Sequence, residues 1–315
     1  MVTKWRGSRM DGRPGEHGEP SAARGDAGAG QELGTTVAER LRRIQGSLSP
    51  AELKIARALM AHYPAAGLES TSGLAGRAGV SPPTVVRFVA RLGFEGYRQF
   101  QQSLRDEVQA RRASPLTLRP VVSESSPTSE LIEAAEEVGR GAVSHTFAAL
   151  PEQEFDRAVE LICDPAKRIV SFGGRFSRLL AEYLDLHLRL LRPGTQVHIP
   201  APGQDGGFRV DLGRREVCVV FDFRRYQRDT VELARFAHER GARVVLFTDP
   251  WLSPVAEFAD VVLPVRVEAP SPFDSIVAPV AVVETLVAAV HVRLGTAAEE
   301  RMRAAEEASG DRTME

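Results

Sequence analysis

Apolar residues in the N-terminal third of the chain recur at the spacing of amphipathic helices. Val37, Leu41 and Ile44 recur at i, i+4 and i+7, and Leu53, Ala56, Leu59 and Met60 follow on a second helix. This period places them on one face of each helix. Ser49 and Pro50 open the second helix, because serine is a favoured N-cap and proline fits the first helical position. The pattern predicts a helical region from Gly34 to about Arg112.

After residue 150 the pattern changes to short buried runs that alternate with amphipathic segments. The runs are rich in β-branched residues and read RIVSFG (168–173), QVHI (196–199), EVCVVF (216–221), RVVLFT (243–248) and DVVLPV (260–265). Apolar runs of this kind are typical of parallel strands that are buried on both faces. Helical segments are expected at 130–150, 175–191 and 228–241. Together they predict an α/β fold with a right-handed, doubly wound sheet of five parallel strands.

Composition divides the chain of 315 residues into five parts, which is enough sequence for two packed domains. Residues 1–30 contain seven Gly, two Pro and almost no apolar periodicity, which predicts a disordered tail. Residues 113–129 are rich in Pro and Ser, as linkers are. We therefore expect an all-α domain at 31–112, an α/β domain at 130–295 and a C-terminal tail at 296–315.

Charge is unevenly distributed, although the whole chain carries a net charge of only −2. Residues 31–112 hold twelve Lys or Arg against seven Asp or Glu, whereas residues 113–315 hold 23 against 31. The helical domain is therefore basic, which is the condition for contacts with nucleic-acid phosphates.

Several features predict a cytoplasmic protein with no membrane partner. The most apolar stretch, 276–290, is shorter than a membrane span and contains Glu284. The N-terminus lacks the apolar core of a secretory signal. Cys163 and Cys218 are the only two cysteines, so the chain has no disulfide framework.

Residues 70–100 contain the turn and helix-cap residues that are typical of a helix-turn-helix. Gly79 supplies the turn, and Ser81 caps a second helix that begins at Pro82. On that second helix, the core face is predicted to carry Val85, Val89 and Leu92, and another face Thr84, Arg87 and Arg91. Arginine can bind guanine through two hydrogen bonds, which suits the second face to the major groove. On this feature alone, an ordinary helical hairpin with solvated arginines fits the sequence equally well.

The segment from Val80 to Tyr97 reads VSPPTVVRFVARLGFEGY and adds a longer motif to the turn and cap residues. It resembles the VS-x-x-T-VVRF-x-x-x-LGF-x-GY/F segment of RpiR/MurR-type bacterial transcription regulators. The resemblance covers roughly 35–295, because that family joins a helix-turn-helix domain to a sugar isomerase (SIS) domain. It implies that a double-stranded DNA operator is bound by Ser81, Thr84, Arg87, Arg91, Tyr97 and Arg98.

Two loops at the carboxyl ends of strands form the predicted effector site, because ligands of open α/β sheets bind at such ends. The first loop, GGRFS (173–177), resembles the family's G-x-G-x-S phosphate loop. The second, DFRRYQRDT (222–230), departs from the family's S-x-S-G-x-T. Asp222 and Arg224 stand for the two serines, Arg225 for the glycine and Gln227 for the threonine. The expected effector-binding residues are Gly173, Gly174, Arg175, Ser177, Asp222, Arg224, Arg225 and Arg228.

The changed loop alters the ligand that is expected. Arginines attract an anion through charge-assisted hydrogen bonds, and we expect Arg175, Arg178, Arg224, Arg225 and Arg228 to converge there. Asp222 repels phosphate, so it should face a hydroxyl or amino group of the ligand or pair with an arginine. Three accounts stay open: a small anionic metabolite of another class, a phosphosugar held by arginines, or no ligand, with Asp222 and Asp229 in a structural network.

The sequence points away from an enzyme. In related isomerases an acidic residue in a late helix can act as a base, which makes Glu284 a catalytic candidate, although a carboxylate there more often orients a neighbour. The seven histidines have no metal-ligand spacing, and Cys163 and Cys218 lie in apolar contexts where thiols are usually inert. We expect no catalytic residue, no metal and no cofactor.

The favoured interpretation is a DNA-binding transcription regulator whose SIS-like domain senses a small anionic effector. A homodimer or homotetramer is expected, paired through the α/β domain and including a late helix that bears Val282, Val283, Leu286 and Val290. The alternatives are a sugar-phosphate isomerase with an accessory helical domain and a constitutive regulator whose SIS-like domain is structural.

Overall fold

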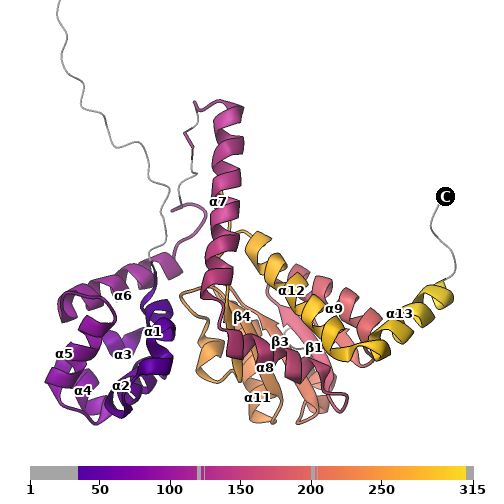
Figure 1. Cartoon of the computed structure of the whole chain (residues 1–315), viewed down its shortest axis with the longest axis horizontal. Coiled ribbons are helices and arrows are strands. Elements are labelled where there is room, and N and C mark those ends of the chain that lie inside the picture. Colours follow the sequence, from indigo (N-terminus) through magenta and orange to yellow (C-terminus); the bar gives the residue numbers. More distant parts are fainter. Residues whose placement is uncertain (1–34, 119–121, 124, 200–202, 204, 310–315) are drawn as a thin grey trace, which may run out of the picture.

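The computed structural model describes residues 35–118, 122–123, 125–199, 203 and 205–309. The tail expected at 1–30 lies outside these residues. The chain forms a helical domain and an α/β domain, which Figure 1 shows side by side with helix α7 rising between them. The helical domain contains α1 (Val37–Ile44), α2 (Pro50–Met60), α3 (Ala65–Leu68), α4 (Thr71–Ala78), α5 (Pro82–Arg91) and α6 (Tyr97–Arg111).

Local signals begin the first two helices of this domain. Thr36 caps α1 and Ser49 caps α2, and each serves in a capping box with the glutamate three residues later. The apolar stripes then meet in one core that contains Leu59, Phe88 and Phe100. Glu107 of α6 is buried in this domain, where it accepts a hydrogen bond from Val37 N at 2.7 Å and another from the Tyr63 hydroxyl. Burial raises the pKa of Glu107 to about 7.

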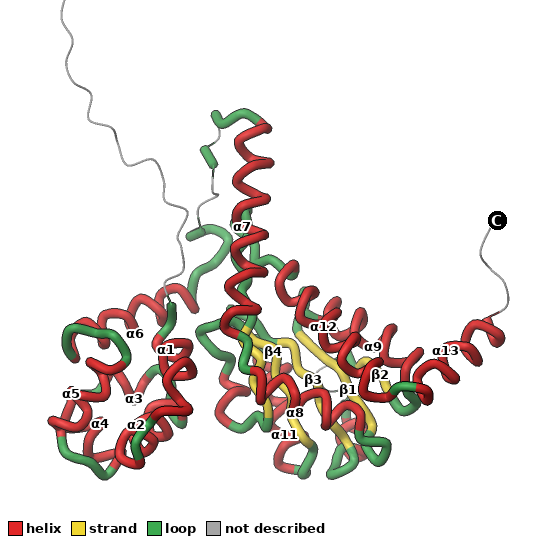
Figure 2. The backbone as a smooth tube through the Cα atoms, in the orientation of Figure 1, coloured by secondary structure: helices red, strands yellow, loops and turns green. Residues whose placement is uncertain are grey.

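The α/β domain is built on a parallel sheet with the strand order β2-β1-β3-β4-β5. Its strands are β1 (Arg168–Gly173), β2 (Thr195–Val197), β3 (Glu216–Phe221), β4 (Arg243–Thr248) and β5 (Val261–Pro264). Its helices are α7 (Thr128–Ala149), α8 (Glu152–Cys163), α9 (Arg178–Leu191), α10 (Gly206–Asp211), α11 (Arg228–Glu239), α12 (Val277–Leu294) and α13 (Thr296–Ser309). Figure 2 shows helices on both faces of the sheet. The predicted doubly wound, five-stranded fold is confirmed.

Alternation along the strands explains the two layers of helices. Val219 and Phe221 of β3 face the core that includes α8, α9 and α12, whereas Cys218 and Val220 face the core that includes α11. Every residue of β3 is buried, which accounts for its continuous apolar run from Val217 to Phe221. The strand order reverses between β1 and β3, and this places the loops after these two strands at the switch point of the sheet.

One expectation about the C-terminal region is wrong. Residues 296–309 form helix α13 instead of a tail, and Ala298 is buried against the core with Met302 beside it. Helix α12 extends beyond the apolar stretch to Leu294, and by length and composition it is the one helix among the described residues that could cross a membrane. The buried face of α12 belongs to the hydrophobic core that the sheet shares with α8 and α9, as in a core helix of an α/β domain.

Candidate DNA-binding helix and effector pocket

Helices α4 and α5 form the helix-turn-helix. Ser70 caps α4 by accepting a hydrogen bond from Gly73 N at 3.0 Å. Gly79 ends α4 in the left-handed conformation, with a φ of 64°, which glycine adopts without steric cost. Val85 and Val89 of α5 and Leu92, which directly follows it, are buried, as the helical spacing predicted.

The other face of α5 groups three polar side chains near its N-terminal end. The hydroxyl oxygens of Ser81 and Thr84 lie 2.8 Å apart, and Arg87 Nη2 lies 3.5 Å from Thr84 Oγ1. Ser81 and Arg87 are exposed and Thr84 is half-buried. The N-terminal residues of a recognition helix are the ones that reach base edges in the major groove. This short row therefore has the position and the chemistry for DNA contact.

The remaining three residues assigned to DNA are placed differently. Arg91 Nη1 donates to Glu52 Oε2 at 2.7 Å and Arg91 Nη2 to Ser47 O at 2.6 Å, so this side chain also links α5 to the first helices. The Tyr97 hydroxyl donates to Glu69 O at 3.0 Å and is part of the internal packing. Arg98 is exposed near the start of α6.

The loop after β1 is built around close backbone approach. A Cβ atom at Gly173 would lie 2.9 Å from Phe221 O, which explains the glycine. Ser177 Oγ accepts from Gly174 N at 2.9 Å and donates to Phe221 O at 2.8 Å. The serine predicted to bind effector therefore ties the loop to β3.

A cavity of about 260 Å³ opens beside this loop. Its lining includes both glycines, the start of α9, the end of the β2 segment and the start of α11, and comprises Gly173, Gly174, Arg175, Arg178, Ile199, Gln227, Asp229 and Thr230. Arg175 and Arg178 bring positive charge to it, and both are exposed. The N-terminal end of α9 carries the positive end of the helix dipole. The cavity therefore suits a small anion.

The five arginines expected to converge on this cavity do not all lie beside it. Arg224 is nearly buried, forms an ion pair with Asp274 and lies over the Trp251 ring at 4.9 Å. Arg228 extends into solvent and donates to Glu232 Oε1 at 2.7 Å. Only Arg175 and Arg178 of the five are among the described residues that line the cavity.

Arg225 has an unusual backbone, with a φ of 66°. Residues other than glycine rarely adopt this left-handed region. The position that the resemblance assigned to a glycine thus keeps the conformation that favours glycine, with an exposed arginine in its place.

Asp222 lies beneath the second loop. Its carboxylate accepts hydrogen bonds from Ser253 Oγ and from Gln227 N, the latter at 3.2 Å. Burial raises the pKa of Asp222 to about 7, and the nearby Asp249 carboxylate acts in the same direction, while Ser253, Gln227 and Arg111 oppose the shift. The carboxylate that was expected to meet a ligand or an arginine is instead bonded to Ser253 and Gln227.

Asp249 is a second buried carboxylate that the sequence reasoning missed. It follows β4 and accepts from the Tyr226 hydroxyl at 2.7 Å and from Trp251 N at 3.0 Å. Burial raises its pKa to about 6. An acidic residue directly after a buried strand was the available signal, since that is where Asp222 was found.

Glu284 and the late helix are also placed differently from the expectation. Glu284 is exposed on α12 and accepts a hydrogen bond from the Tyr183 hydroxyl of α9 at 2.9 Å. The residues expected to pair two copies are buried in the chain's own core, so that assignment is wrong for Val282, Val283, Leu286 and Val290. The exposed apolar residues of this region are instead Leu179, Leu186 and Leu190 of α9 and Val277 and Val292 of α12.

Comparisons with known sequences match both halves of the chain. The helix-turn-helix domain of the rpiR family matches residues 35–111, and the SIS domain matches residues 163–289. An uncharacterized HTH-type transcriptional regulator of Haemophilus influenzae is 26% identical over 231 residues, which are 72% of this chain and 78% of that protein. The bifunctional protein glk of Paraburkholderia xenovorans is 27% identical over 239 residues, but these are only 35% of that longer protein.

A comparison with solved structures agrees. The sugar isomerase domain of the RpiR transcription factor from Sphaerobacter thermophilus has a TM-score of 0.54 and 27% identity, and the match covers 56% of this chain and 99% of that one. The α/β domain of this chain therefore has the fold of that solved sugar isomerase domain. The chain therefore belongs to the RpiR family of helix-turn-helix transcription regulators with a SIS domain, and it is a DNA-binding regulator.

Proposed function

We propose that this regulator acts in the cytoplasm, binds operator DNA through the polar face of α5, and senses a small anionic metabolite in the cavity beside the β1 loop. The observation that carries the proposal is the lining of that cavity. Two glycines, two arginines and the start of α9 surround it. Backbone amides, guanidinium groups and a helix N-terminus are the groups that proteins use to hold phosphates and carboxylates.

The cavity is suited to binding more than to turnover. Isomerisation needs a base in reach of the substrate. Glu284 is engaged by Tyr183, and Asp222 is held under the loop by Ser253 and Gln227. The described lining contains one carboxylate, Asp229, which is exposed. We therefore propose that sugar phosphates are not interconverted by this chain.

Pairing of two chains is part of the proposal, because one helix-turn-helix covers little DNA and symmetric dimers read paired half-sites. The exposed leucines of α9 are spaced at i, i+7 and i+11, which places them on one face. Val277 and Val292 are also exposed, on the neighbouring helix α12. A second copy of the chain would cover the leucine face of α9.

Calorimetric titration tests the effector site directly. A panel of pentose and hexose monophosphates, with inorganic phosphate beside them, is titrated into the wild type, Arg175→Ala and Arg228→Ala. We expect at least one member to bind, and Arg175→Ala to weaken it about tenfold or more through the loss of a charge-assisted hydrogen bond. Arg228→Ala is the matched control, since its side chain points into solvent and pairs with Glu232.

Two results would contradict the proposal. Equal affinity of the wild type and Arg175→Ala would place the effector elsewhere. Interconversion of an aldose phosphate and a ketose phosphate by the purified chain, abolished by Glu284→Gln, would make it an enzyme. Repeating the titration with operator DNA measures the coupling, because each ligand must change the affinity of the other by the same factor.

A further inference from the structure

The helical domain is docked on the edge of the sheet where the strands end. Arg266, which follows β5, donates from Nη2 to both carboxylate oxygens of Glu39 in α1, at 2.9 and 3.1 Å, and both side chains are buried. Thr36 Oγ1 lies 3.4 Å from Pro250 O. The guanidinium of Arg111, at the end of α6, lies 4.5 Å from the centre of the Tyr226 ring. These contacts join the two domains at specific points.

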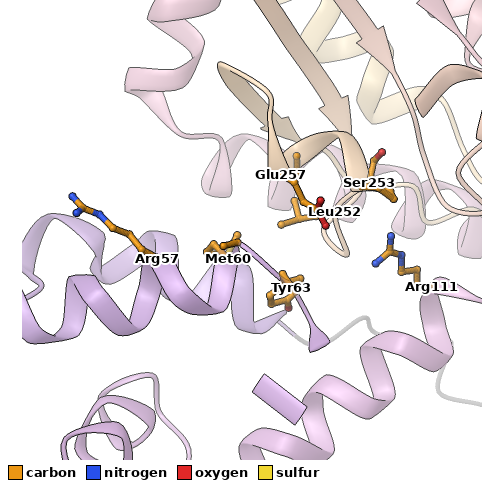
Figure 3. A pocket seen from close by; sticks show the side chains of 10 residues that line it. Arg57, Met60, Tyr63, Arg111, Leu252, Ser253 and Glu257 are labelled. Atoms are coloured by element: carbon orange, nitrogen blue, oxygen red, sulfur yellow. The ribbon is translucent and has the colours of Figure 1, made fainter. Parts of the chain in front are cut away.

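The interface is incompletely packed. A cavity of about 320 Å³ lies between the domains, lined by residues of α2, α6 and the Tyr63 turn on one side and of 252–257 on the other. Figure 3 shows Arg111 pointing from α6 towards the loop that bears Ser253, and both residues line this cavity. Domain cores contain few voids of this size. The docking therefore rests on a few polar and aromatic contacts, which can be broken without unfolding either domain.

One of these contacts belongs to the effector loop. Tyr226 lies in the 222–230 loop, next to Gln227. The Gln227 side chain lines the effector cavity and lies against Gly174, so that a Cβ atom there would approach Gln227 Cδ to 2.7 Å. The Tyr226 side chain points to the other side, where Asp249 binds its hydroxyl and Arg111 covers its ring. Two successive residues thus connect the cavity to the helical domain.

We propose that the Arg111–Tyr226 contact is a releasable latch that couples the effector cavity to the orientation of the helix-turn-helix domain. This inference rests on the proposed function for the identity of the cavity. A ligand that displaces Gln227 shifts the backbone of Tyr226 and removes the ring from beneath Arg111. The contacts of α1, Glu39–Arg266 and Thr36–Pro250, then hold the helical domain at one end only, and α5 loses its fixed direction relative to the sheet.

The latch leaves the recognition face free. Ser81 and Arg87 are exposed in the docked structure, and Figure 1 places α5 on the side of the helical domain away from the sheet. Release therefore changes the direction in which α5 points without uncovering it. In a protein that reads two half-sites, that direction sets the spacing of the two recognition helices.

Distance measurements between spin labels test the latch without any ligand. Labels are attached to cysteines at two exposed positions, Lys54→Cys in α2 and Glu239→Cys in α11, in a Cys163→Ser background; Cys218 is buried. Labelled chain is diluted with excess unlabelled chain, so that each distance is measured within one molecule. The wild type should give a single narrow distance distribution.

Arg111→Gln removes the cation and should cause loss of the single narrow peak. Arg112→Gln removes a charge of the same sign at the next residue, which is exposed, and should keep the single narrow peak. Circular dichroism of both variants checks that the helices are retained. An unchanged narrow peak in Arg111→Gln, or equal broadening in Arg112→Gln, would overturn the proposal.

Gly174→Ala substitutes for the effector, because the added methyl group must displace the flexible end of Gln227. It should broaden the distribution as Arg111→Gln does, and the double variant Gly174→Ala/Gln227→Ala should restore the narrow peak. No change in Gly174→Ala, or persistent broadening in the double variant, would overturn the coupling. The titrations with sugar phosphates test the proposed function separately, so either idea can fail while the other stands.

Discussion

Replacement of Asp222 by asparagine should remove a pH dependence from the stability of the protein. The carboxyl is buried under the 222–230 loop, and its pKa is raised from 3.8 to about 7. A carboxyl whose pKa is higher in the folded than in the unfolded state stabilises the fold below its unfolded pKa. That contribution is lost as the pH rises through the folded pKa. Wild-type Asp222 therefore costs increasing stability from about pH 4 to pH 7.

The size of the effect follows from the same shift. Between pH 5 and pH 7 the unfolded chain is ionised at this residue and the folded chain is protonated, so stability falls by about 1.4 kcal/mol per pH unit. From pH 5 to pH 8 the loss is about 2–3 kcal/mol. Asparagine has nearly the shape of the protonated carboxyl but does not ionise. The stability advantage of Asp222→Asn over the wild type should therefore widen by that amount.

Thermal unfolding at a series of pH values measures this difference. For a domain of this size, 2–3 kcal/mol corresponds to a gain of about 5–10 °C in the Tm of Asp222→Asn relative to the wild type between pH 5 and pH 8. Titrating groups that do not interact with Asp222 cancel in the comparison. Asp229→Asn, an exposed carboxylate of the same loop, is the matched control and should show no such trend. A constant Tm difference between Asp222→Asn and the wild type across this range would refute the burial argument.

Three further substitutions are informative. Arg225→Gly should raise the Tm and stabilise the protein by about 0.5–1 kcal/mol, because glycine removes the steric strain of the left-handed backbone. Part of the gain is lost, since glycine also increases the entropy of the unfolded chain. A lower Tm would mean that the arginine side chain makes a necessary contact. Tyr97→Phe should cost about 1 kcal/mol in urea unfolding through loss of its bond to Glu69 O, with operator affinity unchanged. Arg91→Ala should lower the stability of the helical domain as well as operator affinity, since it breaks the contact with Glu52, and a loss of affinity alone would assign Arg91 to DNA only.

The strands could be predicted where their signal is local. β1, β3 and β4 begin at Arg168, Glu216 and Arg243, and each has the bounds expected from its apolar run. β2 is shorter than expected, because it lies at the edge of the sheet and pairs only with β1. Its side chains are half-buried or exposed, so its pattern is weaker.

Helix α13 was missed for a related reason. Its sequence is rich in charge, and few apolar residues mark its buried side. The helix packs on α9, whose Arg189 carbonyl accepts a hydrogen bond from Arg301 Nε at 2.8 Å. Stability that comes from such a distant partner leaves little trace in local periodicity.

The loops of the site were predicted, but the partners of their side chains were not. Gly173 and Arg175 lie where the switch-point argument placed them. Arg224 instead forms an ion pair with Asp274, 50 residues further along the chain. Asp222 accepts a hydrogen bond from Ser253, 31 residues further along. Which carboxylate an arginine meets depends on the packing of loops from different strands, and charge counts within one loop do not contain that information.

Operator binding is the most direct test of the central claim. Purified chain is incubated with fragmented genomic DNA, the bound fragments are sequenced, and affinity for the recovered site is measured for the wild type and Arg87→Ala. We expect enriched sites with paired half-sites about 34 Å apart or at a multiple of that spacing, and a loss of about 5–150-fold in Arg87→Ala, equivalent to about 1–3 kcal/mol. Recovery of no enriched sequence, or equal affinity of Arg87→Ala and the wild type for the recovered site, would contradict the account of α5 as the recognition helix.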